Sequence, residues 1–74
     1  MIDNVEVARR ISDEMLDYSR RIDESVAFVR DGCSVEEFKA YRLAAGKVLG
    51  EIYLEVLIPL YRKHPELKPA GLKV

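Results

Sequence analysis

The chain has 74 residues, 49% of them hydrophobic, with 12 basic and 13 acidic residues and a net charge of −1. This length limits it to one domain, and so apolar a composition excludes a disordered chain. The balanced charge provides no positive field for nucleic acid or an anionic membrane, and one cysteine excludes an internal disulfide framework. We expect a cytoplasmic protein, because a lone thiol suits a reducing compartment and the first residues lack a signal-peptide pattern.

A first helix is predicted over residues 4–31. Asp3 and Asn4 are both good N-cap residues, and the apolar residues that follow are spaced three or four apart, as on one face of a helix. These residues are Val5, Ala8, Ile11, Met15, Tyr18, Ile22, Val26 and Val29. A helix of this length is a rod of about 40 Å.

The sequence DGCSVEE predicts a tight turn between two helices. Gly32 suits the left-handed conformation that often closes a helix. Ser34 followed by Glu37 is a capping box, which starts the next helix almost at once. Because so short a link forces the helices to lie antiparallel, residue i of the first helix should lie level with about residue 66 − i of the second.

The second helix is predicted over residues 35–63, with a kink or stop near Pro59, because proline lacks a backbone donor and crowds the carbonyl group of Glu55. Residues 1–64 would then form the hairpin, and residues 65–74, with two prolines and a glycine, an irregular tail. The helix has two apolar stripes. The first consists of Val35, Phe38, Tyr41, Ala45, Val48, Ile52, Val56 and Pro59.

The second stripe predicts an association surface, because one partner helix can cover only one side of the second helix. Leaving large side chains exposed forfeits about 1.5–3 kcal/mol each, which is a large part of the stability of so small a domain. A second copy of the chain is the favoured cover, ahead of a different protein or an apolar ligand or membrane surface. Gly46 and Gly50, four residues apart in the second stripe, would allow helix backbones to approach closely. The predicted interface residues are Leu43, Gly46, Gly50, Tyr53, Leu54, Leu57 and Tyr61.

A cluster of carboxylates provides the main chemical alternative. The antiparallel register places acidic residues of both helices at one level, and bundles hold Mg²⁺, Mn²⁺ or di-iron with such groups. The spacing lacks a Glu-x-x-His motif, so a solvated face paired with arginines is the favoured interpretation and no metal or other cofactor is expected. The residues concerned are Asp13, Glu14, Asp17, Glu51 and Glu55.

The remaining candidate residues have ordinary structural explanations. The two arginine pairs, at residues 9–10 and 20–21, are interleaved with acidic residues and predict a salt-bridged surface. Cys33 precedes a helix N-terminus but has no histidine near it in the sequence. His64 suits the C-terminus of a helix, and the four tyrosines suit core or interface positions with their hydroxyl groups at the rim.

The sequence thus predicts an all-α protein, a long antiparallel helical hairpin that dimerises into a four-helix bundle. That architecture is similar in shape to small plasmid-control hairpin dimers, and only this likeness suggests regulation. The expected function is a homodimeric interaction or regulatory module that binds neither nucleic acid nor membrane, and an enzymatic activity is left open as the less favoured interpretation. A metal-dependent hydrolase and an adaptor subunit of a larger complex are the alternatives, and the direction of the dimer stays open.

Overall fold

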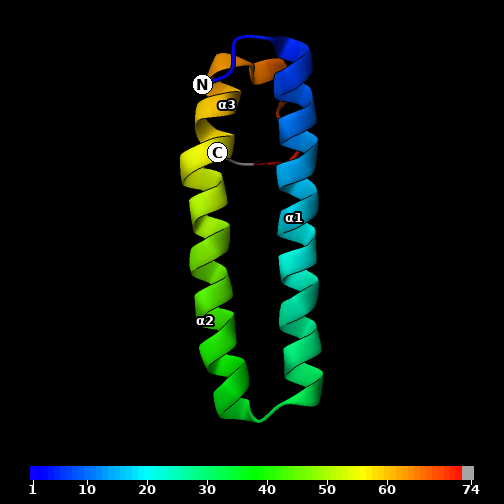
Figure 1. Ribbon diagram of the computed structural model, residues 1–74, viewed down its shortest axis with the longest axis vertical. Coiled ribbons are helices and arrows are strands. Elements are labelled where there is room, and N and C mark those ends of the chain that lie inside the picture. The colour runs from blue at the N-terminus through cyan, green and yellow to red at the C-terminus, as the bar shows by residue number, and fades with distance from the viewer. Residues whose placement is uncertain (73–74) are drawn as a thin grey trace.

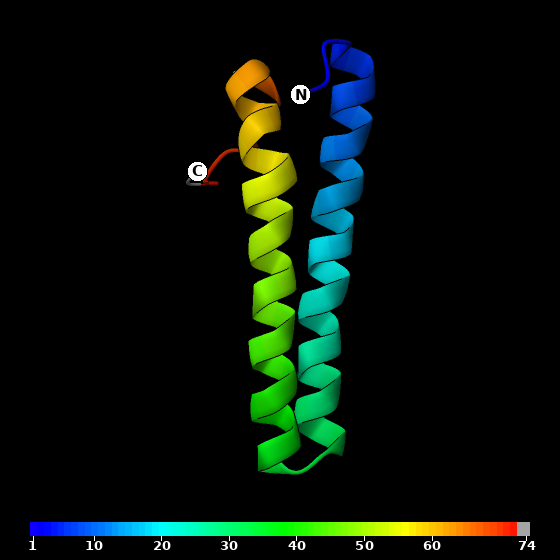
Figure 2. The same ribbon diagram turned by 60° about the vertical axis from the view of Figure 1, so that its left-hand side comes forward.

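The protein is an all-helical hairpin in the part that the structure, a computed structural model, describes, residues 1–72. Two antiparallel arms lie side by side and join at one end, and the molecule measures 45 × 20 × 16 Å (Figures 1 and 2). The first arm is α1 (Val5–Gly32). The second arm consists of α2 (Val35–Glu51), a π-helical segment η1 (Ile52–Leu57) and α3 (Ile58–Lys63). The predicted helical hairpin is therefore confirmed.

Asn4 starts α1. Its side-chain oxygen accepts hydrogen bonds from the backbone N–H groups of Glu6 at 2.9 Å and Val7 at 3.1 Å, which satisfies two donors that have no partner within the helix. The other N-cap candidate, Asp3, forms an ion pair with Lys63 at the end of the second arm instead. Asn4 is therefore the N-cap residue, and Asp3 has its partner in the second arm.

The inner face of α1 follows a seven-residue repeat. Seven of its buried and half-buried residues alternate in steps of four and three, as expected for a helix that packs along a single partner, and Ile11, Leu16 and Ser25 beside them are half-buried too. The seven are Ala8, Ser12, Met15, Ser19, Ile22, Val26 and Val29. Two of them are serines, which a count of apolar residues overlooks. Tyr18 and Val5 were predicted on this face, but their exposed fractions are 43% and 36%.

The turn contains the predicted capping box. The backbone N–H of Ser34 donates to Oε1 of Glu37 at 3.0 Å, and the backbone N–H of Glu37 donates to Oγ of Ser34 at 3.2 Å. The left-handed conformation predicted for Gly32 is wrong. Gly32 is the last residue of α1, and Gly71 is the one glycine with positive φ in the described range. The chain leaves α1 through an extended Cys33 (φ −131°, ψ 172°), so no left-handed residue is needed.

Three contacts between the arms confirm the register predicted from the turn. The hydroxyl groups of Ser25 and Tyr41 lie 2.6 Å apart, and Asp3 pairs with Lys63. His64 makes a hydrogen bond of 2.7 Å to the carbonyl oxygen of Ile2. In each of these pairs the two residue numbers add to 66, whereas the contact between Ser12 and Tyr61, whose numbers add to 73, departs from the relation by seven residues.

Pro59 does not end the second arm. It lies in the first turn of α3, and the irregularity comes before it, in η1, where the N–H of Ile58 bonds to the carbonyl group of Tyr53. Proline crowds the carbonyl group four residues earlier, here that of Glu55, and the wider π-helical turn gives this group room. Each residue of a π-helical turn advances less around the axis than an α-helical residue. The residues after η1 therefore face a different direction from the one that a continuous α-helix would give them.

The buried core lies in the half of the hairpin nearest the termini. Six of the buried residues lie there: Ala8, Ser12, Leu57, Leu60, Tyr61 and His64. Ser19 in α1 and Ala45 in α2 are buried nearer the middle of the hairpin. Between Arg20 and Ala44, by contrast, no side chain is buried. We call residues 20–44 the tip half of the hairpin. The terminal half has a core of its own, and the tip half has half-buried contacts alone.

The expected irregular tail begins with a single turn of 3-10 helix, η2 (Pro65–Leu67). A turn closed by the hydrogen bond from Leu72 N–H to Pro69 O follows, and Gly71 takes φ +86° within it. Glycine has no Cβ, so it adopts this left-handed conformation without strain. The last two residues of the predicted tail, 73 and 74, lie outside the described range.

Candidate functional site

The outer side of the second arm presents a row of apolar and small residues that runs over α2 into the start of η1. We define the outer α2 surface as Leu43, Gly46, Gly50 and Leu54. The two leucines expose 64% and 63% of their area, and Gly46 is exposed while Gly50 is half-buried. Steps of three and four place these residues along one side of the helix, away from Ala45, the buried residue of α2. A Cβ atom added to either glycine would meet nothing within 4 Å, so the protomer itself does not occupy this surface.

Leu57 and Tyr61, which were predicted on this surface, lie inside the hairpin. Leu57 is fully buried and Tyr61 exposes 4% of its area, and Tyr53 is half-buried. The prediction extended a regular α-helical stripe through η1 and beyond it, whereas the wider turn of η1 rotates the residues after Leu54 toward α1. The surface available to a partner thus ends at Leu54.

The hydroxyl group of Tyr61 is buried as well, and not at the rim as expected for the tyrosines. It lies 2.5 Å from the hydroxyl group of Ser12, which is 2% exposed. A buried hydroxyl needs such a partner, because leaving it without one costs about 1–3 kcal/mol. The pair joins the two arms and supports the position of both helices in the core.

A second group of exposed residues lies on a broad face formed by both arms. The hydrogen bond between Ser25 and Tyr41 crosses that face. Tyr18 precedes Ser25 by seven residues and Val48 follows Tyr41 by seven, so both lie on the same face one heptad nearer the termini. Their exposed fractions are 43% and 51%, and that of Tyr41 is 38%. We call these four residues the tyrosine face.

The predicted carboxylate cluster does not form a metal site in the described residues. Within residues 1–72, no three His, Cys, Asp or Glu side chains lie close enough together to hold a metal ion. Glu14 pairs with Arg10 at 3.2 Å, and Asp17 pairs with Arg20 at 2.6 Å. The other three, Asp13, Glu51 and Glu55, are exposed. The geometry provides the salt-bridged surface of α1 that the interleaved charges predicted.

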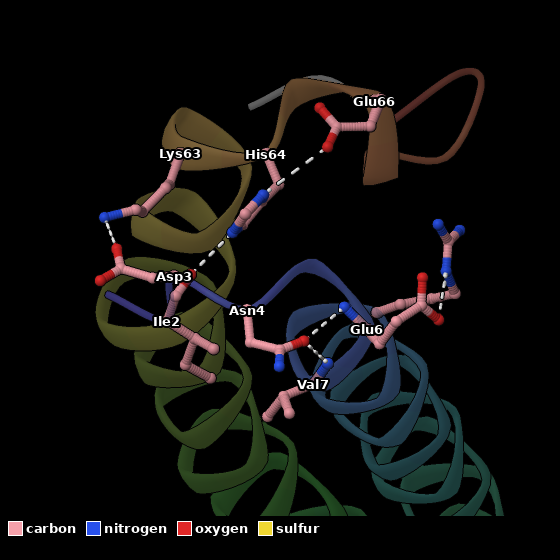
Figure 3. A network of polar contacts seen from close by, with 9 residues as sticks. Ile2, Asp3, Asn4, Glu6, Val7, Lys63, His64 and Glu66 are labelled. Atoms are coloured by element: carbon pink, nitrogen blue, oxygen red, sulfur yellow. Dashed lines mark hydrogen bonds and ion pairs between the residues drawn. The ribbon is translucent and has the colours of Figure 1, made fainter.

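Polar contacts close the open end of the hairpin (Figure 3). His64 is 8% exposed, and its Nε2 donates to the carbonyl oxygen of Ile2 while its Nδ1 lies 3.6 Å from Glu66. Beside it, Lys63 pairs with Asp3, and its hydrogen bond and positive charge lower the pKa of the Asp3 carboxyl group. His64 therefore fastens the N-terminal segment to the second arm. The sequence did not reveal this role, because the partner is a backbone carbonyl group 62 residues away.

The described residues also include a small open pocket near this end. It has a volume of about 220 Å³ and is lined by Ile58, Tyr61, Arg62, Pro65 and Lys68. Pockets that enclose small molecules usually measure about 300–1,000 Å³, so this one is small for a ligand site. Cys33 is exposed at the turn, away from this pocket. The outer α2 surface is thus the stronger candidate for a functional site.

None of the helices in residues 1–72 has both the length and the apolar character needed to cross a membrane. Comparison of the chain with protein-family models, with curated proteins and with solved structures finds no match.

Proposed function

We propose that the protein is a homodimeric interaction module, in which two hairpins pack together into a four-helix bundle. The observation that supports this most directly is the absence of any buried side chain between Arg20 and Ala44. This tip half also includes some of the most exposed apolar side chains of the described chain, with Phe28 at 81%, Leu43 at 64% and Val35 at 60%. A second hairpin that packs beside the second arm would cover Leu43, the one of these three residues that also belongs to the outer α2 surface.

The overall dimensions support the same conclusion. A compact chain of 74 residues has a radius of gyration of about 11 Å, whereas that of the hairpin is 14.5 Å. A globular monomer of this mass exposes about 4,700 Å², whereas the hairpin exposes 5337 Å². The excess of about 600–700 Å² is close to the roughly 800 Å² that each partner buries in a standard protein interface. One interface would therefore bring the exposed area per chain down to the ordinary value for its size.

A cytosolic setting fits this proposal. Cys33 is free and exposed, and a reducing compartment keeps such a thiol from forming disulfides with other proteins. A dimer held by apolar contacts needs no disulfide. The thiol also provides a single site for chemical labelling.

Sedimentation equilibrium over a wide range of protein concentrations tests the proposal. The expected mass rises with concentration from that of the 8.5 kDa chain to twice that value, because dimerisation follows mass action. A mass that stays at 8.5 kDa up to millimolar concentration would contradict the proposal. It would favour an adaptor that offers the same surfaces to a different protein.

A further inference from the structure

The outer α2 surface has a palindromic arrangement of residues. Read from either end, the surface gives a leucine, a glycine, a second glycine and a leucine, and Leu43 in α2 and Leu54 in η1 lie at equal distances from a point between residues 48 and 49. We propose that a second copy of the chain binds this surface in the antiparallel direction, across a two-fold axis at that point. The inference rests on the proposed homodimer and specifies its contact surface and its direction.

In this arrangement, residue i of one α2 lies level with residue 97 − i of the other. Leu43 is then level with Leu54 of the second copy at both ends of the contact. Gly46 lies one residue from the level of the second copy's Gly50. Neither glycine has a neighbour within 4 Å of where its Cβ would be, so the two backbones can approach between the leucine pairs.

The charges beside the surface favour the antiparallel direction. Lys47 and Glu51 are both exposed, and within the described range neither has an ion-pair partner closer than 4 Å. In the antiparallel dimer, Lys47 is level with residue 50 of the second copy, one residue from the second copy's Glu51. Two symmetrical pairs of opposite charge result. In a parallel dimer each residue is level with its own counterpart, so Lys47 meets Lys47 and Glu51 meets Glu51, which is unfavourable.

The tyrosine face fits a second copy less well. Two hydroxyl groups at its centre, those of Ser25 and Tyr41, already bond to each other at 2.6 Å, so burying them brings no new hydrogen bond. The outer α2 surface has no internal polar contact of this kind within residues 1–72, and its free charges lie at its edge. The apolar residues of the tyrosine face therefore serve as controls in the test.

The direction of the dimer can be measured with spin labels on the native Cys33. This thiol is exposed at the turn, and it lies level with residue 64 of the second copy in the antiparallel dimer, 31 residues from that copy's own Cys33. At 1.5 Å per residue, pulsed dipolar spectroscopy should give a distance of about 46 Å or more. A parallel dimer places the two turns at the same end, within about 25 Å or two helix diameters. A short distance would overturn the inference and leave the homodimer proposal standing.

Exchange of the two charges tests the contact itself. Lys47→Glu and Glu51→Lys each create two like-charge pairs in the antiparallel dimer, so each should weaken the dimer by about tenfold. The double variant Lys47→Glu/Glu51→Lys restores both pairs and should recover most of the wild-type affinity. If the pairs meet as in the parallel dimer, all four proteins have like charges opposed and the same affinity, and this result would also overturn the inference.

Two further variants locate the surface. Leu54→Gln should weaken the dimer by about tenfold or more, because the leucine contributes twice to the contact. Its control, Val48→Gln, removes an exposed apolar side chain from the tyrosine face and should leave the affinity unchanged. The reverse pattern would move the contact to the tyrosine face. A chain that stays monomeric under all conditions would remove the proposed function itself, a result that these affinity differences cannot be confused with.

Discussion

The two glycines of α2 have opposite expected effects in the single hairpin and in the dimer. Both lie in the interior of α2, and positive φ is found for no glycine in residues 1–72 except Gly71. Alanine fits such a backbone, and in the protomer its Cβ would meet nothing within 4 Å at either site. Glycine in a helix interior is less favourable than alanine by about 0.8–1.0 kcal/mol. The variant Gly46→Ala/Gly50→Ala should therefore stabilise the isolated hairpin by about 2 kcal/mol.

In a chain of this size, 2 kcal/mol raises the melting temperature by about 8–16 °C. In the dimer the same two methyl groups lie where the backbones of the α2 helices approach each other. They hold the helices apart, and the leucine contacts on both sides lose dispersion energy that falls off steeply with distance. The double variant should thus melt at a higher temperature than wild type when dilute and should gain less, or nothing, when concentrated.

Circular dichroism melts at two protein concentrations about a hundredfold apart measure this difference, because dimerisation makes the melting temperature depend on concentration. The matched control is Ala44→Gly, the reverse substitution at an exposed position of α2 outside the outer surface. It should lower the melting temperature equally at both concentrations. If Gly46→Ala/Gly50→Ala also shifts both melts equally, the glycines are not part of a contact and the reasoning fails.

Three further results are expected. Leu57→Ala should lower the free energy of unfolding of the monomer by about 2–5 kcal/mol in urea denaturation, because the side chain is fully buried; Leu54→Ala, at 63% exposure, should change it by less than about 0.5 kcal/mol, and equal losses would contradict the placement of Leu57 in the core. Tyr61→Phe should cost about 1–3 kcal/mol by leaving the buried Ser12 without a partner, and it should cost less in a Ser12→Ala background, so additive losses would argue against the bond. Lys63 lowers the pKa of Asp3, so the contribution of Asp3 to folding stability is present above about pH 4 and is lost as the pH falls through the lowered pKa. Amide chemical shifts of the N-terminal segment should show this acid transition. A transition that persists in Asp3→Asn would assign it to another group.

The predictions from sequence succeeded where structure depends on neighbouring residues. Ser34 and Glu37 lie three positions apart and bond to each other's backbone in the turn. From that turn the register of both arms follows, as the contact of Ser25 with Tyr41 shows 16 residues apart. Capping chemistry is local, so a short stretch of sequence contains everything needed to infer it.

One group of failures has its origin in contacts between distant parts of the chain. Ser12 is buried because Tyr61 lies opposite it, and nothing near Ser12 in the sequence indicates a partner 49 residues away. Ser19 is buried although its own hydrogen bond is local, from its hydroxyl group to the carbonyl group of Met15 at 2.9 Å within α1. A polar residue of this kind counts against the core in a hydrophobicity pattern, although its hydrogen bond removes the penalty for burial.

The candidate surface could be predicted in part. A regular helical repeat correctly separates the exposed Leu43 and Leu54 from the buried Ala45. The same repeat fails after Leu54, because the π-helical segment η1 changes the phase and brings Leu57 and Tyr61 inward. Pro59 indicated an irregularity in the helix, but a proline alone does not show whether the helix stops, bends or widens. Whether a second copy covers the surface stays a prediction.

The π-helical segment η1 also determines how far the exposed apolar surface extends along the second arm. Without η1, a continuous α-helix would expose Leu43, Leu54, Leu57 and Tyr61 as one apolar row toward the termini. An apolar row that continues to the end of a molecule allows copies to bind in shifted positions and to add without limit, as head-to-tail contacts that do not close do in filaments. Because η1 turns the later residues inward, the apolar row ends at Leu54, about three helical turns after Leu43. An assembly built on this row has a fixed length.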